Sequence, residues 1–123
     1  MFHQVEFIGY LGRDPEMRYS PSGKPVTTFS VASSRHNGEK TETIWFRVTA
    51  WDKLGELVNL HLKKGSKVFV QGRLNPGDNG SPVVFKRGDD TFGASYDVVT
   101  TPVRFLDPKS ATEQDEDEES IPF

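Results

Sequence analysis

The sequence predicts an all-β domain with one short helix, followed by an acidic tail. Apolar residues alternate with polar ones along most of residues 1–106, which is the period of half-buried strands. Residues 53–64 instead space their apolar side chains as one face of a helix does. The chain has 123 residues, enough for one compact domain and a short appendage. We therefore expect one binding domain over residues 1–106 and a separate acidic tail over residues 107–123.

Two strands are predicted in the first third of the chain. Val5, Phe7 and Leu11 alternate with polar or small neighbours, which indicates the first strand. Residues 21–25 read PSGKP, a cluster of turn-forming residues. The β-branched run VTTFSVAS over residues 26–33 predicts the second strand.

The third predicted strand, TIWFRVTAW over residues 43–51, has two different faces. One face is apolar and consists of Ile44, Phe46, Val48 and Ala50. The other face consists of Trp45, Arg47, Thr49 and Trp51. We expect the strand to bury the first face and to present aromatic rings and a guanidinium on the second.

A short amphipathic helix is predicted after this strand. Asp52 stands where a helix N-cap is expected. The apolar stripe of the helix comprises Leu54, Leu57, Val58 and Leu62. Its cationic last turn and its stop are formed by Lys63, Lys64 and Gly65.

Residues 66–74, SKVFVQGRL, predict a fourth strand with the same division of faces. The residues expected to point inward are Val68, Val70 and Leu74. Those expected to point outward are Lys67, Phe69, Gln71 and Arg73. A long polar hairpin over residues 75–93 and a last strand over residues 94–105 complete the predicted domain.

This order of three strands, a helix and two strands is that of the OB-fold, a five-stranded Greek-key barrel. Oligonucleotides usually bind the strand face and two of the loops of such a barrel. Outward aromatic and cationic residues on two strands suit single-stranded nucleic acid, because unpaired bases stack on flat rings and phosphates attract positive charge. Sugars and proteins also bind OB barrels, so the fold alone does not decide the function.

The net charge of −3 conceals a division along the chain. Residues 107–123 hold seven acidic side chains against one lysine, a net of −6, and residues 1–106 carry a net of +3. A basic body with an acidic tail is the pattern expected of a nucleic-acid-binding protein.

The composition argues against metal binding and catalysis. The chain has no cysteine, and its three histidines, His3, His36 and His61, lack ligand spacing, so we expect no metal and no other cofactor. RGDD at residues 87–90 matches short metal-binding and adhesion patterns, but its place in a Gly-rich hairpin predicts a turn. Because no nucleophile and base pair or phosphate loop occurs elsewhere, we expect no enzymatic activity and no catalytic residue.

Membrane association is not expected either. No apolar run approaches membrane-spanning length, and the first ten residues lack the features of a signal peptide. We therefore expect a cytoplasmic location.

Two long stretches resemble one family. Residues 9–32, GYLGRDPEMRYSPSGKPVTTFSVA, and residues 43–74, TIWFRVTAWDKLGELVNLHLKKGSKVFVQGRL, look like the bacterial single-stranded DNA-binding protein (SSB) family. The acidic run with Ile121, Pro122 and Phe123 is similar to that family's C-terminal tip. The resemblance implies an OB-fold homotetramer, with a dimer as the alternative, that binds single-stranded DNA without sequence preference. It also implies recruitment of DNA replication, recombination and repair proteins through the tip.

The resemblance places the family's stacking aromatics on Trp45 and Trp51. Phe69 is a weaker stacking candidate, because an aromatic ring there could instead serve a subunit contact. Basic support is expected from outward faces and loops, at Arg13, Arg18, Lys24, Arg47, Lys53 and Arg73.

The chain departs from the family pattern at two stacking positions. Many members carry a tryptophan near the end of the second strand, where this chain has Arg35 and His36, and another in the hairpin, where it has NPGDNG. A replacement for one of them is expected in the hairpin, from Phe85 or Phe92 with their basic neighbours Lys86 and Arg87.

The tail contains DEDEESIPF over residues 115–123 and is expected to remain disordered, because so few apolar residues cannot bury enough surface to fold. A partner with an apolar pocket rimmed by Lys or Arg is expected to hold its tip. The partner-binding residues are then Asp117, Glu118, Glu119, Ile121, Pro122 and Phe123. The linker of residues 108–112 is shorter than in many members of the family, which puts in question the mode of DNA wrapping and any cooperativity that needs a long linker. Ser120 stands where the tip of the family usually has another acidic residue. A tail that only competes with DNA for the basic face is the alternative.

Two other functions stay open from the sequence. Stacking faces and phosphate-binding charges serve RNA as well as DNA, so an RNA-binding OB protein of the cold-shock kind fits the same residues. The barrel face could also bind a protein while the tail recruits a second one, which would make the chain an interaction adaptor.

Overall fold

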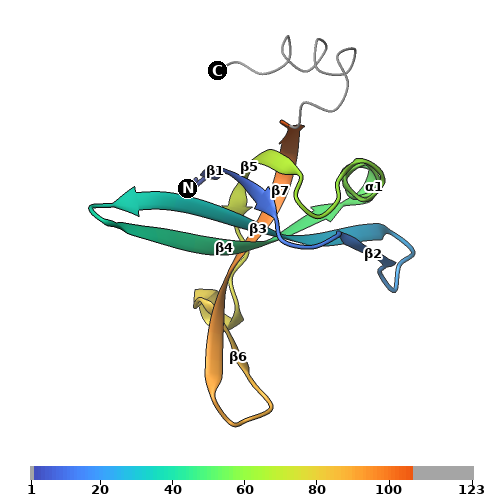
Figure 1. Ribbon diagram of the computed structural model, residues 1–123. Coiled ribbons are helices and arrows are strands. Elements are labelled where there is room, and N and C mark those ends of the chain that lie inside the picture. Colours follow the sequence, from blue (N-terminus) through green and yellow to red (C-terminus); the bar gives the residue numbers. More distant parts are fainter. Residues whose placement is uncertain (1, 107–123) are drawn as a thin grey trace.

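The computed structural model describes residues 2–106, with the backbone alone over residues 101–105. Its elements are β1 (Val5–Leu11), β2 (Glu16–Tyr19), β3 (Pro25–Asn37), β4 (Lys40–Trp51), α1 (Asp52–His61), β5 (Lys67–Leu74), the short 3-10 helix η1 (Asp78–Gly80), β6 (Val83–Lys86) and β7 (Phe92–Phe105). Figure 1 shows the strands crossing around one centre, with α1 on one side. The sequence did not predict β2 and β6 as strands, because four residues are too few to show a clear alternation.

The strands close into a barrel. The hydrogen-bonded order is β1-β5-β7-β4-β3-β2, and β1 also pairs with β3 through Tyr10 opposite Ala32 and Leu11 opposite Val31. Strands β4 and β7 run parallel, whereas the other pairs among the described strands are antiparallel. With the helix inserted between β4 and β5, this arrangement is that of the OB-fold, and the predicted fold class is confirmed.

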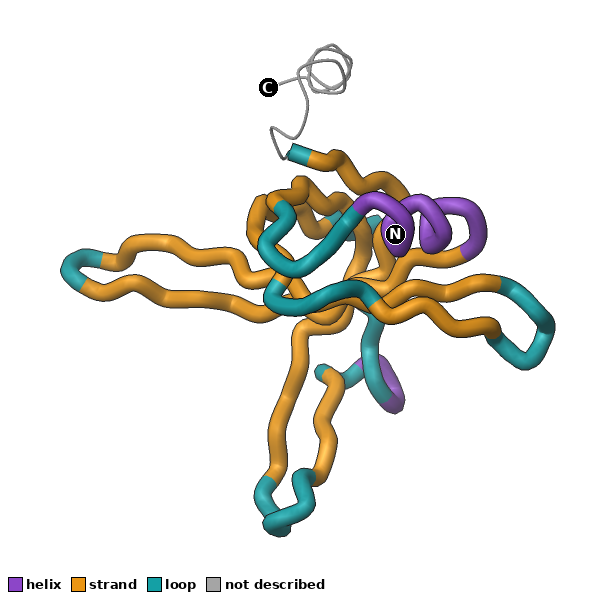
Figure 2. Tube along the Cα trace, turned by 45° about the vertical axis from the view of Figure 1, so that its right-hand side comes forward, coloured by secondary structure: helices purple, strands orange, loops and turns teal. Residues whose placement is uncertain are grey.

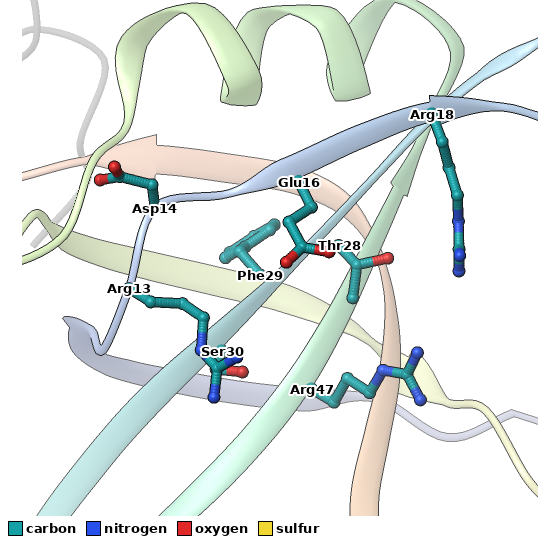
Figure 3. A pocket seen from close by; sticks show the side chains of 8 residues that line it. All are labelled: Arg13, Asp14, Glu16, Arg18, Thr28, Phe29, Ser30 and Arg47. Carbon is teal, nitrogen blue, oxygen red and sulfur yellow. The ribbon is translucent and has the colours of Figure 1, made fainter.

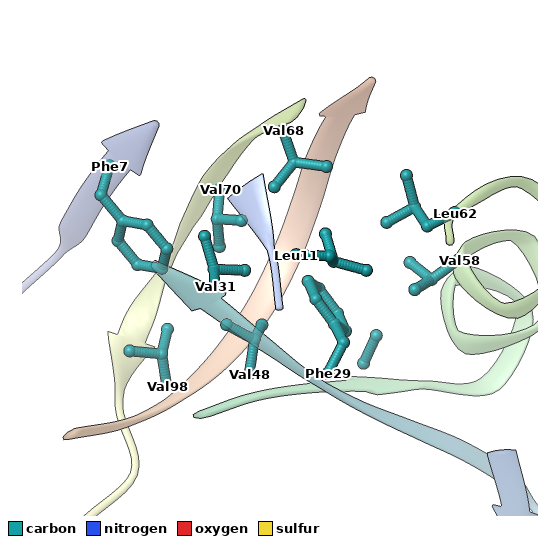
Figure 4. Packing of buried hydrophobic residues seen from close by; sticks show 11 residues of the cluster. Phe7, Leu11, Phe29, Val31, Val48, Val58, Leu62, Val68, Val70 and Val98 are labelled. Carbon is teal, nitrogen blue, oxygen red and sulfur yellow. The ribbon is translucent and has the colours of Figure 1, made fainter. Parts of the chain in front are cut away.

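The core fills the barrel and continues under the helix, as Figure 4 shows. Fully buried side chains from several strands and from α1 meet there: Phe29, Val31, Val48, Val58, Val68, Val70 and Val98. Burying each of these side chains contributes about 1.5–3 kcal/mol. The helix is also held by a buried hydrogen bond of 2.6 Å, which the Thr27 hydroxyl donates to the carbonyl oxygen of Gly55. A side chain at Gly55 would meet the Ala50 carbonyl oxygen at 2.6 Å, so glycine permits this close approach.

Three hairpins project from the barrel, as the tube in Figure 2 shows. They are the turn between β2 and β3, the far ends of β3 and β4, and the β6–β7 hairpin. Pairing of β3 with β4 continues without interruption from Val26 opposite Trp51 to Asn37 opposite Lys40. Both strands are therefore longer than predicted, because polar cross-strand pairs extend them past the apolar alternation on which the prediction rested.

The helix begins and ends differently from the prediction. Trp51 is the N-cap, and Asp52 is the first helical residue with φ 58°, so the expected capping role of Asp52 is wrong. A short acidic residue tolerates this left-handed conformation better than most side chains do. The helix ends at His61 with Leu62 as the C-cap, so Lys63 and Lys64 follow the helix instead of forming its last turn.

Three apolar side chains are less buried than predicted. Leu74 stands opposite the buried Val98 but is the last residue of β5, and it is 47% exposed. Ile44 lies at the base of the projecting β3–β4 hairpin and is 38% exposed, and Leu57 on α1 is 40% exposed. The helix buries a narrower stripe than predicted, centred on Gly55 and Val58.

Candidate nucleic-acid interface

The outer face of β3 and β4 presents the predicted aromatic and cationic residues. Trp45 stands opposite Ala32, and Arg47 stands opposite Ser30. The partners on β3 are small, so they leave the larger side chains of β4 uncovered. Trp45 is 53% exposed and Arg47 is exposed, which makes both accessible to a ligand.

A groove joins this face to the β6–β7 hairpin. Its volume is about 390 Å³, and its lining residues are Ser30, Trp45, Phe46, Arg47, Phe85 and Ser95. Phe85 reaches the groove because it pairs with Gly93 on β7, where an added Cβ would lie only 2.6 Å from the ring Cζ of Phe85. The groove thus brings together two exposed rings and one guanidinium from segments far apart in the sequence.

The groove is firmly backed on the barrel side. Phe46 points inward from β4 and stacks on Phe7, with ring centroids 3.9 Å apart and an interplanar angle of 8°. Phe46 also contacts the ring of Tyr96, at a centroid distance of 6.0 Å. Such ring contacts contribute about 0.5–1.5 kcal/mol beyond burial and fix the wall of the groove.

The two hairpin phenylalanines have different positions. Phe85 faces the groove, and the guanidinium carbon of Arg87 lies 5.4 Å from its ring centroid. Arg87 also donates a hydrogen bond of 2.7 Å to the carbonyl oxygen of Phe92. Phe92 pairs with Lys86 one position along the ladder, so both side chains belong to the opposite face of the hairpin. Of the two candidates for the missing stacking position, the structure brings Phe85 to Trp45.

A second cavity continues from the groove, since Ser30 and Arg47 line both. Its volume is about 220 Å³, and it is lined by Arg13, Asp14, Glu16, Arg18, Thr28, Phe29, Ser30 and Arg47. In Figure 3 its three arginines come from three parts of the chain and share this space with the Glu16 carboxylate. Asp14 accepts a hydrogen bond of 2.8 Å from the backbone N–H of Lys64, so one of its carboxylate oxygens already has a partner. We call this cavity the arginine pocket.

The remaining predicted residues line neither cavity. Trp51 is 43% exposed at the far end of β4, and Lys24 and Lys53 are exposed in the β2–β3 turn and the first turn of α1. Arg73 stands opposite Val99, which in turn stands opposite Thr49, so it shares the outer face across β7. The structure does not bring Phe69 to the groove: it is half-buried opposite Ile8 on the β1–β5 side of the barrel.

Sequence reasoning missed three residues that line the two cavities, which are Ser30, Ser95 and Glu16. Ser30 and Ser95 line the groove, and their small side chains leave it open. Glu16 enters the arginine pocket because β2 pairs with β3 and places Glu16 opposite Thr28. No sequence pattern marked these residues, since their role depends on a strand pairing that was not predicted.

The RGDD segment forms a turn, as predicted. The N–H of Arg87 bonds to the carbonyl of Thr91 at 2.7 Å, and the N–H of Asp90 bonds back to the carbonyl of Arg87. Hydrogen bonds from the Thr91 hydroxyl and then from its backbone N–H lower the pKa of the exposed Asp89 carboxyl. Over residues 2–106, no group of three His, Asp or Glu side chains could hold a metal ion.

The sequence matches the Single-strand binding protein family over residues 2–79. The chain belongs to this family. A single-stranded DNA-binding protein of Thermotoga maritima is 36% identical over 125 residues, which cover 98% of this chain and 84% of the relative. A protein of the same name from Neisseria meningitidis serogroup A is 37% identical over 109 residues, and single-stranded DNA-binding protein 1 of Chlorobaculum tepidum is 35% identical over 119 residues.

The aligned shares of these relatives differ. The match covers 85% of this chain and 59% of the Neisseria protein, and 89% of this chain and 67% of the Chlorobaculum protein. Membership in the Single-strand binding protein family confirms the resemblance seen in the sequence and the expectation that the chain is not an enzyme. Among the described residues, no helix is both long enough and apolar enough to cross a membrane.

Proposed function

We propose that this protein binds single-stranded DNA without preference for base sequence. The observation that carries the proposal is the groove, because it places Trp45, Phe85 and Arg47 on one accessible surface. Unpaired bases of any identity stack on the rings, and the guanidinium neutralises phosphate. The arginine pocket extends this positive charge along β3 toward β2. The names of the three relatives support the same ligand.

Tryptophan fluorescence tests this proposal directly. The protein is titrated with oligo-dT, with a DNA duplex of equal length and with oligo-rU, at two salt concentrations. We expect strong quenching by oligo-dT and little by duplex, because paired bases are not free to stack on an indole. Equal binding of the duplex, or no quenching, would contradict the proposal and favour an adaptor that binds protein. Tighter binding of oligo-rU would favour an RNA ligand.

The arginine pocket is proposed to contact the DNA backbone. Arg18→Ala should then make the slope of log K against log salt about 0.7 less negative for each phosphate that the variant no longer neutralises. Lys40→Ala, at the exposed first residue of β4, is the control and should leave the slope unchanged. Equal slopes for the wild-type protein and Arg18→Ala would remove Arg18 from the DNA path.

We propose that the chain assembles as a homotetramer, with a dimer as the alternative. One OB barrel contacts only about 4–16 nucleotides, so several linked barrels raise the affinity for a long strand through effective concentration. Ile8, which is 42% exposed, and Phe69 stand opposite each other on the outer surface of β1 and β5 and offer apolar area for a subunit contact. Light scattering that gives the mass of one chain at micromolar concentration would contradict both states.

We also propose that residues 113–123 recruit proteins of DNA replication, recombination and repair, which places the protein at the nucleoid in the cytoplasm. This segment lies outside the described residues, so the proposal rests on its acidic run beside Ile121, Pro122 and Phe123. Deletion of Phe123 should abolish pull-down of such partners and leave oligo-dT affinity unchanged. Deletion of residues 113–123 should raise DNA affinity modestly at low salt, since a competing negative charge is removed. Retention of every partner after the Phe123 deletion would contradict the docking role.

A further inference from the structure

Tyr10, at the end of β1, lies on the same outer surface as Trp45. It stands opposite Ala32 on β3, and Ala32 stands opposite Trp45 on β4. Residues paired in this way project from the same face of a sheet. The residue between the two aromatic positions is only an alanine, and Tyr10 is 54% exposed. A ligand can therefore pass from Trp45 across β3 to Tyr10 without meeting a large side chain in between.

The indole of Trp45 extends across β3 to Gly12, which follows Tyr10 by two residues along the chain. A Cβ built on Gly12 would lie 2.5 Å from Cζ3 and 2.7 Å from Cη2 of Trp45, so the six-membered ring covers this glycine. Gly12 is fixed against β3 by its N–H, which donates a hydrogen bond of 3.1 Å to the Ser30 carbonyl. Tyr10 and Gly12 are two residues apart, so their Cα atoms are separated by at most about 7 Å. The ring of Trp45 thus reaches the segment that carries Tyr10.

Lys67 supplies a positive charge beside this ring. Tyr10 and Lys67 stand opposite each other on β1 and β5, and the Lys67 Nζ lies 5.9 Å from the centroid of the Tyr10 ring. A cation at this distance is attracted to the face of the ring and restricts its orientation. An aromatic platform with an ammonium next to it is the pair of groups that a stacked nucleotide and its phosphate require.

We propose that Tyr10 is a further base-stacking platform, with Lys67 contacting the adjacent phosphate of a single-stranded polynucleotide. The path then runs from Phe85 over Trp45 and across Ala32 to Tyr10, with Trp45 in the middle. This inference rests on the proposed binding of single-stranded DNA and names a residue that extends its path. Tyr10 is then the third ring on this path, after Phe85 and Trp45. The β3–β4 hairpin, in contrast, has polar residues at the expected stacking position.

The test combines affinity with a direct probe of contact. Tyr10→Ala should raise the Kd for oligo-dT about fivefold or more, and Tyr10→Phe, which keeps the ring, should stay near the wild-type value. Tyr19→Ala removes a tyrosine on β2 that is 63% exposed and should leave the affinity unchanged. Oligo-dT carrying 5-iodouracil is then irradiated on the wild-type protein, and adducts are mapped by mass spectrometry. Adducts are expected at both Tyr10 and Trp45. These residues lie in different tryptic peptides, Tyr10 in residues 1–13 and Trp45 in residues 41–47.

The outcomes separate this inference from the function on which it rests. If the wild-type protein does not bind oligo-dT, the proposed function fails. If it binds and crosslinks at Trp45, but Tyr10 gives no adduct and Tyr10→Ala keeps its affinity, only the inference about Tyr10 fails. Light scattering is measured on each variant. If Tyr10→Ala changes the number of chains in the assembly, and the wild-type protein gives no adduct at Tyr10, the ring belongs to a subunit contact and the inference is overturned.

Discussion

The β3–β4 hairpin and the β6–β7 hairpin project from the same barrel but are built from different residues. The first is closed by polar cross-strand pairs: Ser34 with Thr43 at 2.8 Å, and the Arg35 guanidinium with the Glu42 carboxylate at 3.2 Å. The second carries exposed apolar side chains, which are Val84, Phe85 and Phe92. Polar pairs hold a hairpin together without offering a surface on which a base can stack. A projecting hairpin therefore adds to the proposed interface only where it presents an aromatic ring on the outer face.

Trp45 stands where both hairpins meet the barrel, so its loss should have the largest effect. Trp45→Ala should weaken oligo-dT binding by about 1–3 kcal/mol, or roughly 5- to 150-fold in Kd, because its ring lies in the middle of the proposed path. Trp51→Ala should cost less, since Trp51 lines neither the groove nor the arginine pocket. Fluorescence anisotropy of labelled oligo-dT measures both. Equal losses would contradict the ranking.

The two faces of the β6–β7 hairpin allow a matched comparison. Phe85→Ala should weaken oligo-dT binding by about 1 kcal/mol or more, because Phe85 lines the groove beside Trp45. Phe92→Ala removes the same side chain from the opposite face and should have little effect on binding. Calorimetric titration with oligo-dT distinguishes the two variants. A greater loss for Phe92→Ala would show that the strand follows the other face of the hairpin.

The β3–β4 hairpin should gain a stacking position by substitution. His36 pairs with Thr41 and lies an even number of residues from Ala32, so it shares the outer face with Trp45. His36→Trp should therefore increase the affinity for a long oligo-dT a few-fold, and the gain should shrink for a short one. Arg35→Trp, on the opposite face of the same hairpin, is the control. A similar gain from both substitutions would indicate nonspecific contact instead of an extended path.

The smallest effect is expected at the tip of the β6–β7 hairpin and depends on pH. Because hydrogen bonds from Thr91 lower the folded pKa of Asp89, its contribution to hairpin stability is present above the ordinary carboxyl pKa of about 3.9. That contribution is lost as pH falls through the lowered value. NMR titration of the Thr91 amide should show its hydrogen bond released only below the ordinary pKa of an Asp carboxyl, and Asp89→Asn should abolish this transition. A Thr91 amide that does not respond to pH would contradict the assignment.

The sequence predicted the strands that carry the core and the hairpin over residues 75–93, but not the length of the β3–β4 hairpin. The alternation in residues 43–51 placed Trp45 and Arg47 on the outer face and Val48 and Ala50 in the core, as observed. Alternation reports only burial within one strand. The extension of β3 to Asn37 is held by polar pairs between strands, and such pairs leave no apolar period.

The sequence also did not predict which side chains line the groove. Phe85 and Phe92 were equivalent candidates, because both are aromatic and next to basic residues. Their difference follows from the register that pairs Phe85 with Gly93 and Lys86 with Phe92, and a hairpin register depends on its turn geometry. The place of Tyr10 depends in the same way on the closure of β1 against β3.

That closure has a consequence for folding kinetics. The barrel joins segments distant along the chain, with Val5 of β1 opposite Gly72 of β5 and Val68 of β5 opposite Phe105 of β7. Domains dominated by such nonlocal pairings fold in milliseconds to seconds, because loop-closure entropy is lost before the pairings form. Trp45 packs on Gly12 only once β1 has joined β3, so its emission should report that pairing. During refolding, the competence to bind a polynucleotide should therefore emerge no earlier than that optical signal.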